Sequence, residues 1–292
     1  MGDLVLASGL LLLVGTGLAW VGYRAGKQST LAALTLSVPV AVLIAAYIVL
    51  FRDHPLLVWL VPTTALPVLG NPLPPLGMAL AGILLGQTKL PRWRRCVLVL
   101  PVLVFAWEGP VRLITNVPPD TTPRWSDGVA LQSTRSTCTA AATATLLTHH
   151  GIDADETTMA RICLTDARGT SLLGMHRGLR IMTRDSGYRP TVDRRTLDEL
   201  QKDIGRLPAI LSMQLTRGVL EREPRYGEDW GWDVGVLHTV VIYGFTEDER
   251  VEIGDPGVGR EFWSIQSVED LWTGETTWLV PTGSADPTPE HN

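Results

Sequence analysis

This chain of 292 residues has few charged residues and few cysteines, and its basic residues do not outnumber its acidic ones. Asp, Glu, Lys and Arg make up only 19% of it, against 45% hydrophobic residues, and most of the apolar runs lie before about residue 110. The net charge is −5 and no clustered basic face is visible, which argues against binding to nucleic acid. The composition therefore indicates a membrane region followed by one soluble domain of roughly 150 residues, a size that can bury its own core.

The small number of cysteines excludes a disulfide framework. There are three, Cys96, Cys138 and Cys163, with no CxxC pair and no zinc-type spacing. His149 and His150 are adjacent at the end of an expected helix, which favours a C-terminal cap over metal chelation. We therefore expect no metal site and no cofactor. The chain also contains no GxxxxGK[ST] phosphate-binding loop, so no nucleotide is expected as a ligand.

The first part of the chain contains long apolar segments. Residues 4–23 and 31–51 each have the length of a membrane span. Residues 55–87 are interrupted at 70–75 and are compatible with one broken span or with two short helices. Residues 96–107 form a short fourth run that needs flanking residues to cross a bilayer. The sequence thus predicts about four transmembrane helices within residues 1–108, without a cleaved signal peptide.

The basic residues of this region predict its orientation. Arg24 and Lys27 lie between the first two spans, and a second basic group that includes Lys89 and Arg92 precedes the last. With four spans, both groups fall on the cytoplasmic side of a bacterial inner membrane, and the soluble domain falls on the extracytoplasmic side. No acidic residue lies within the four apolar runs, so a plain anchor in the lipid bilayer is the expected role.

Helical patterns precede strand patterns in the second part of the chain. After a Pro/Thr-rich linker at 109–126, helices are expected from Cys138 to a cap at Gly151, after Asp155, over 172–184 and after the capping box that opens at Thr196. Short strands are expected at 208–215, 238–245, 250–253, 261–265 and 276–280. This order predicts an α+β domain over 127–281, followed by a disordered tail at 282–292. The polar segment between residues 215 and 236 is either a substrate-binding lid or a solvated loop.

A cysteine at a helix start is the first candidate functional residue. Cys138 opens the helical run, where unpaired backbone N–H groups and the helix dipole favour a thiolate. Cys163 instead falls on the packed face of the next helix and is expected to be a core thiol. Gln132 lies six residues before Cys138.

Two residues of the strand region supply what a cysteine nucleophile needs. His238 begins an apolar strand, and Asp255 follows the next strand, at a turn. A hairpin of these two strands would bring the imidazole and the carboxylate side by side. The carboxylate would then hold the ring in the useful tautomer and stabilise its cation.

The order Gln132, Cys138, His238, Asp255 resembles that of the C39 peptidases, which are papain-like cysteine proteases that trim leader peptides in bacteriocin exporters. The resemblance covers residues 126–279. It implies a papain-like fold, Cys138 as nucleophile, His238 as general base and acid, Asp255 as the orienting carboxylate and Gln132 as an oxyanion-hole donor. Thr139 departs from the family, which usually has Gly directly after the cysteine.

Together these features predict a membrane-anchored cysteine endopeptidase that hydrolyses a peptide or protein substrate. The alternative is a papain-like domain without turnover, which would act as a membrane-tethered binding module for a peptide or a partner. A short distance between the Cys138 sulfur and the His238 ring would favour the enzyme.

Overall fold

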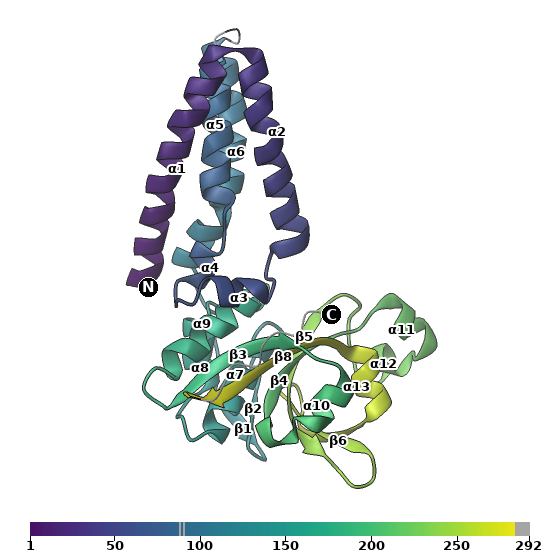
Figure 1. Ribbon diagram of the computed structural model, residues 1–292. Coiled ribbons are helices and arrows are strands. Elements are labelled where there is room, and N and C mark those ends of the chain that lie inside the picture. Colours follow the sequence, from purple (N-terminus) through teal and green to yellow (C-terminus); the bar gives the residue numbers. More distant parts are fainter. Residues whose placement is uncertain (88, 90, 284–292) are drawn as a thin grey trace. The chain divides into compact units, whose positions relative to one another are not determined.

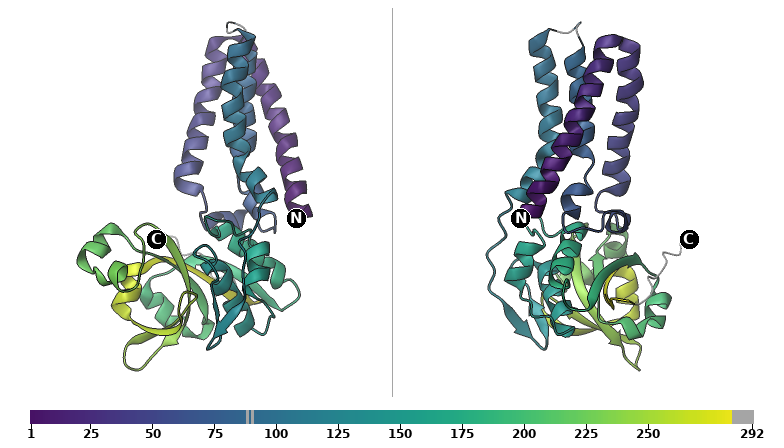
Figure 2. Two further views of the ribbon diagram at one scale, coloured as in Figure 1. Left: turned by 180° about the vertical axis from the view of Figure 1, so that it is seen from behind. Right: turned by 60° about the vertical axis from the view of Figure 1, so that its left-hand side comes forward.

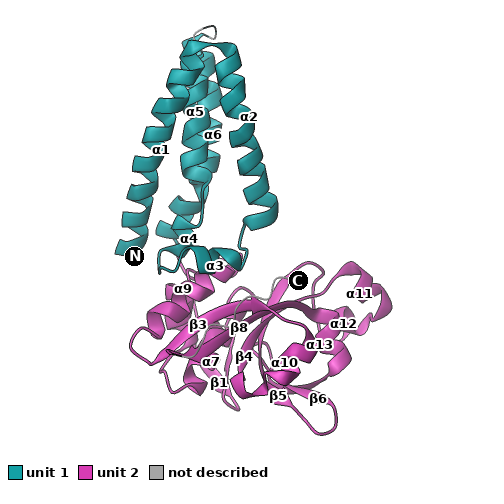
Figure 3. Cartoon of the chain, viewed as in Figure 1, with its two compact units in different colours: residues 1–116 teal, residues 117–292 magenta. Residues whose placement is uncertain are grey.

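The computed structural model describes residues 1–87, 89 and 91–283, and these form two compact units, Met1–Asn116 and Val117–Asn292 (Figure 3). Only the first two residues of the tail expected from position 282 belong to the described part of the chain.

All regular secondary structure in the described residues of unit 1 is helical. Its elements are α1 (Gly2–Gln28), α2 (Thr30–Ala46), the π-helical turn η1 (Tyr47–Phe51), α3 (Leu56–Leu60), α4 (Leu66–Leu69), α5 (Leu73–Gly86) and α6 (Arg92–Ile114). The long helices run lengthwise beside one another (Figure 1). Four segments are long and apolar enough to cross a membrane: Gly2–Gln28, Thr30–Phe51, Leu66–Gly86 and Arg92–Ile114.

The structure gives bounds to the third and fourth apolar segments. Within residues 55–87, Leu66–Gly86 is one candidate span with a break at residues 70–72, between α4 and α5, and α3 is not part of it. The fourth helix is 23 residues long, about twice the apolar run, because flanking residues on both sides join it. It continues to Ile114, so the first six residues of the expected linker are helical, and Glu108 lies within the helix.

Glycines allow α1 and α5 to pack at backbone distance. A Cβ atom at Gly22 would lie 2.4 Å from the carbonyl oxygen of Ala79, and one at Gly82 would lie 2.0 Å from that of Ala19. Gly26 and Gly86 are equally crowded by the facing helix. Spacing of small residues by four is typical of close helix pairs in membranes, where packing replaces hydrophobic burial as the source of stability.

Unit 2 combines helices with a curved antiparallel sheet (Figures 1 and 2). The first part contains β1 (Arg124–Ser126), β2 (Val129–Leu131), α7 (Cys138–His149), α8 (Glu156–Ile162), α9 (Leu172–Met182), β3 (Tyr188–Arg194) and α10 (Leu197–Lys202). The second part contains η2 (Ile204–Arg206), β4 (Ala209–Gln214), α11 (Arg217–Arg222), α12 (Arg225–Glu228), β5 (Leu237–Phe245), β6 (Arg250–Asp255), β7 (Gly259–Ser264), α13 (Ile265–Leu271) and β8 (Trp272–Pro281). The main sheet has the order β3-β8-β4-β5-β6-β7, with every pair antiparallel.

The expected α+β arrangement is confirmed for this unit, with helices packed on both faces of the sheet. Alternate residues of β4 and β5, such as Leu211 and Val240, belong to a buried cluster that includes residues of α10, α11, α12 and α13. The intervening residues Ile210 and Val241 are also buried, on the opposite face, where α7 contacts both strands. The helix α7 is therefore a core element, with residues 138–147 all buried.

Local signals explain the ends of several helices. The side chain of Asp155 caps α8 by accepting the backbone N–H of Thr158, and Thr196 with Glu199 completes the expected capping box. Gly151 ends α7 with a φ of +73°, and the next residue donates its N–H to Leu147.

Candidate active site

Cys138 is the first residue of α7, as the sequence predicts. Its side chain points into the protein, with 6% of the residue exposed. Residues 132–137 connect it to β2, whose hairpin with β1 turns in two residues, Asp127 and Gly128, both with positive φ. A thiol in this position is buried, yet next to the positive end of a helix of twelve residues.

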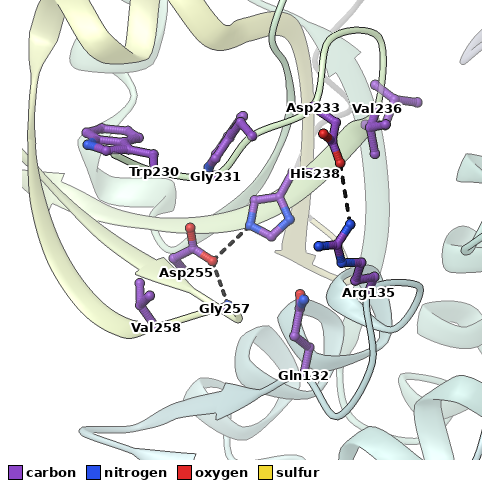
Figure 4. A pocket seen from close by; sticks show the side chains of 12 residues that line it. Gln132, Arg135, Trp230, Gly231, Asp233, Val236, His238, Asp255, Gly257 and Val258 are labelled. Carbon is purple, nitrogen blue, oxygen red and sulfur yellow. Dashed lines mark hydrogen bonds and ion pairs between the residues drawn. The ribbon is translucent and has the colours of Figure 1, made fainter. Parts of the chain in front are cut away.

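His238 and Asp255 meet across neighbouring strands, as expected from their strand ends. Nε2 of His238 lies 2.8 Å from Oδ1 of Asp255. The same oxygen accepts the backbone N–H of Gly257 at 2.6 Å, so the carboxylate has two donors. Figure 4 shows the pair of His238 and Asp255. Because Asp255 is bonded to Nε2, the other ring nitrogen, Nδ1, is the one available to Cys138.

The electrostatics of the site favour a charged pair. Burial alone lowers the pKa of His238, but its hydrogen bond to Asp255, and next that to Cys138, raise this pKa to about 10. Burial likewise raises the pKa of the Cys138 thiol, but the hydrogen bond and charge of His238 outweigh it and hold the pKa below its usual value. Both directions stabilise a thiolate beside an imidazolium.

Gln132 follows β2, and its side chain points toward His238 (Figure 4). Its backbone N–H donates to the carbonyl of Pro256 at 2.8 Å, which fixes the residue beside the Asp255 turn. Its side-chain Oε1 is buried and has no hydrogen-bond partner among the described residues. Buried polar atoms are nearly always paired, so the amide has hydrogen-bonding capacity left for a bound molecule.

These side chains surround an open pocket of about 230 Å³ (Figure 4). Its lining consists of Gln132, Arg135, Trp230, Gly231, Trp232, Asp233, Val236, Leu237, His238, Asp255, Gly257 and Val258. Cys138 is not one of these lining residues. The structure thus brings His238, Asp255 and Gln132 to the pocket surface, while the buried Cys138 and His238 influence each other's pKa.

The polar segment between residues 215 and 236 is neither a plain loop nor solvated throughout. It contains α11 and α12, and its later part forms one wall of the pocket. The ring of Trp232 packs edge-on against His238, with 5.1 Å between centroids. Arg135 and Asp233 form an exposed ion pair at 3.5 Å across the pocket entrance. The contact of Trp232 with His238 depends on the folded sheet and is not predicted from the sequence.

Glu156 is a structural partner of the site that no sequence pattern indicates. It is buried, with 1% exposure, and its two carboxylate oxygens accept the backbone N–H and the hydroxyl of Ser133 at 2.6 and 2.5 Å. In the sequence it is an acid in the first turn of a helix, a position usually explained by the helix dipole. In the structure it anchors the loop between Gln132 and Cys138.

The remaining candidate residues lie away from the pocket. Cys163 is fully buried, and burial raises its pKa to about 12, which agrees with the expected core thiol. His150 follows α7, and its Nδ1 lies 2.9 Å from the carbonyl of Leu146, as expected for a C-terminal cap. His149 packs against Tyr243.

Comparisons with known proteins find no matching family model and no matching curated protein. Solved structures do match. The peptidase domain of Streptococcus ComA, a bi-functional ABC transporter involved in a quorum sensing pathway, is 19% identical, with a TM-score of 0.42 over 52% of this chain and 96% of that one. A double glycine motif protease from an AMS/PCAT transporter, in complex with its leader peptide, is 20% identical, with a TM-score of 0.41 over 57% of this chain and 99% of that one. The peptidase domain of Streptococcus mutans ComA is 19% identical, with a TM-score of 0.37 over 53% of this chain and 99% of that one. These proteins are what the chain is similar to, and at such TM-scores the matches assign no family to it.

Proposed function

We propose that the chain is a membrane-anchored cysteine endopeptidase with a papain-like catalytic domain. The observation that carries the proposal is the meeting of three elements: a thiol at the start of α7, an imidazole on β5 and a carboxylate at the end of β6. The 2.8 Å bond between His238 and Asp255 and the opposite pKa directions of Cys138 and His238 support a charged thiolate–imidazolium pair. Such a pair is the resting state of a cysteine nucleophile.

In the proposed reaction, the Cys138 thiolate attacks the carbonyl carbon of a peptide bond. The protonated His238 then gives its proton to the leaving nitrogen, the C–N bond breaks, and a thioester remains. Water loses a proton to His238 and attacks the thioester, the C–S bond breaks, and the acid leaves as the thiolate and the imidazolium form again. Asp255 keeps the ring oriented throughout and offsets its positive charge.

Gln132 is the proposed donor to the oxyanion. Its side chain lines the pocket, and the NH2 group of its amide is the donor that this role requires. The backbone N–H of Cys138, at the first position of α7, is the second donor in this proposal. Loss of one such donor typically costs about 3 kcal/mol of transition-state stabilisation.

The four long apolar helices of unit 1 support the anchor. The proposed location is the bacterial inner membrane, with the catalytic domain on the extracytoplasmic side because the basic residues lie between spans one and two and before span four. A peptide or protein outside the cytoplasm is then the proposed substrate.

One observation favours the second candidate, a binding module without turnover. Only 6% of Cys138 is exposed, and the pocket lining does not include it. In that case the pocket would hold a peptide against Gln132 and His238, and no covalent intermediate would form.

Labelling with a thiol-directed peptidase inhibitor such as E-64 distinguishes the two functions. We expect wild-type protein and Cys163→Ala to be labelled and Cys138→Ala to lose the label at this site, because only Cys138 has an activating imidazole. Intact-protein and peptide mass spectrometry identify the modified cysteine, which also separates Cys138 from the exposed Cys96. Absence of label on Cys138 in folded wild-type protein would favour the binding module.

A further inference from the structure

Thr139, the residue where the chain departs from the family it resembles, lies at the centre of a buried contact. Its hydroxyl oxygen is 2.8 Å from the hydroxyl oxygen of Thr239 and 3.9 Å from the sulfur of Cys138. Both threonines are nearly inaccessible, with 8% and 7% exposure. A Gly or Ala at position 139 would remove the hydroxyl that joins the strand to the sulfur.

The positions of the two threonines make this contact specific. Thr139 is the second residue of α7, directly after Cys138, and Thr239 is on β5, directly after His238. The hydroxyl pair therefore joins the two elements one residue beyond the thiol and one residue beyond the imidazole.

We propose that Thr139 and Thr239 are positioning residues for the nucleophile, which fix the start of α7 against β5 and donate a hydrogen bond through Thr139 to the Cys138 sulfur. This inference deepens the proposed function and rests on it. A hydroxyl has one donor and two acceptor sites, so Thr239 can donate to Thr139 while Thr139 donates to the sulfur. The second of these hydrogen bonds then ends on the negatively charged sulfur, and a hydrogen bond to a charged acceptor is stronger than one between neutral groups.

The electrostatics of the site agree with this geometry. Among the influences that lower the thiol pKa, after the hydrogen bond and charge of His238, are the side-chain hydroxyl of Thr139 and the backbone N–H of Thr239. The titratable group that acts on Cys138 is His238 of β5, and Asp255 of β6 acts in turn on His238. Neither threonine titrates, so their effect is a fixed one that does not change with pH.

The test is the pH dependence of iodoacetamide alkylation at Cys138, measured in the full chain by mass spectrometry of the Cys138 peptide. Thr139→Val keeps the shape of the side chain and removes its hydroxyl, and Thr139→Ser restores the hydroxyl. We expect Thr139→Val to raise the thiol pKa by roughly one unit, a tenfold loss of thiolate below that pKa, and Thr139→Ser to stay near wild type. We expect Thr239→Val to raise the thiol pKa by a smaller amount, because the hydroxyl of Thr239 acts on the sulfur only through Thr139.

Thr143→Val is the matched control. Thr143 is a buried residue of the same helix, and its hydroxyl donates to the carbonyl of Thr139. The substitution Thr143→Val makes the same chemical change one turn further along α7, and we expect the pKa of the Cys138 thiol to stay at its wild-type value. An unchanged pKa in Thr139→Val, or an equal shift in Thr143→Val, would overturn the inference.

The measurement needs no substrate, so it separates this inference from the proposed function. A wild-type thiol that titrates at the ordinary pKa of a free cysteine contradicts the activated nucleophile, and with it both proposals. A lowered wild-type pKa that is insensitive to Thr139→Val contradicts the positioning role alone.

Discussion

At the scale of single residues, Asp255 has the main influence that favours the charged form of His238. Its carboxylate is 5% exposed and accepts hydrogen bonds from His238 and from the backbone of Gly257. Little solvent competes for it, so its charge acts strongly on the imidazole. Burial would otherwise favour the neutral ring, and it is Asp255, helped by Cys138, that raises the pKa of His238 to about 10.

We expect Asp255→Asn to narrow the pH range of activity from its alkaline side. The imidazolium is stable below the pKa of His238 and is lost as pH rises through it, so a lower pKa moves the alkaline limb of kcat/KM to lower pH. Asn keeps an acceptor for Nε2 but removes the charge, and the expected shift is roughly one unit or more. We also expect kcat at neutral pH to fall roughly 10- to 100-fold, because the neutral amide orients the ring and offsets its positive charge less well than the carboxylate does.

Asp248→Asn makes the same chemical change at an exposed turn, where Asp248 pairs with Thr246 and Arg250. Its pH–rate profile should match that of the wild type. An unchanged alkaline limb in Asp255→Asn would show that the carboxylate does not set the charge of His238.

At the scale of elements, the site depends on how the loop between β2 and α7 is held. Glu156 of α8 accepts two hydrogen bonds from Ser133. Within the loop, Thr137 accepts the backbone N–H of Thr134 at 3.1 Å. The backbone of Gln132 is bonded to Pro256. The loop therefore has anchors on α8 and on the turn after β6, which keeps Gln132 next to the pocket without regular secondary structure.

Glu156→Ala is expected to lower both stability and activity. It leaves the half-buried N–H of Ser133 without its acceptor, which costs about 1–3 kcal/mol and lowers Tm by several degrees in a unit of this size. The loosened loop displaces Gln132, so kcat should also fall. Thermal unfolding and peptide hydrolysis of the same preparation measure the two effects.

The neighbouring substitution Asp155→Ala is the control, because it removes the N-cap of the same helix at a cost of about 1 kcal/mol. It should lower Tm and leave kcat unchanged well below the transition. Equal values of kcat for Glu156→Ala and Asp155→Ala would mean that the loop anchor has no role in the reaction.

Elements with local signals were the ones that could be predicted from the sequence. The capped helices and the apolar strands β4, β5 and β6 have such signals. The positions of His238 and Asp255 at the ends of two neighbouring strands likewise predict that the two side chains meet. The strand β3 was missed because Pro190 and its charged neighbours obscure the alternation. It pairs only with β8 at the edge of the sheet, where a proline is tolerated. The end of α6 was missed because Pro110 reads as a break, yet it lies inside the helix.

The rest of the site depends on contacts between residues far apart in sequence. Thr139 meets Thr239 one hundred positions later, and Trp232 meets His238 only after α11 and α12 have folded the segment back. No periodicity or local motif encodes these contacts. The sequence therefore predicts which residues are chemically suited to the site, and the sheet determines which neighbours act on them.

At the scale of the whole molecule, unit 1 and the order of its charges determine where the reaction would take place. If each of the four candidate spans among the described residues crosses a membrane once, the N-terminus and unit 2 lie on the same side of it. Arg24 and Lys27 lie at the end of α1, and Arg92 begins α6. Basic residues favour the cytoplasmic side, so unit 2 is expected on the extracytoplasmic side.

Reporter fusions in a bacterial host test this orientation. Alkaline phosphatase folds only outside the cytoplasm, and a fluorescent protein that folds only in the cytoplasm reports the opposite side. We expect a fusion after Asn292 to give phosphatase activity without fluorescence. A fusion after Lys27, between the first two spans, should give the reverse and serves as the control. Fluorescence at Asn292 would mean that residues 55–87 cross the membrane an even number of times, which would place the peptidase and its substrate in the cytoplasm.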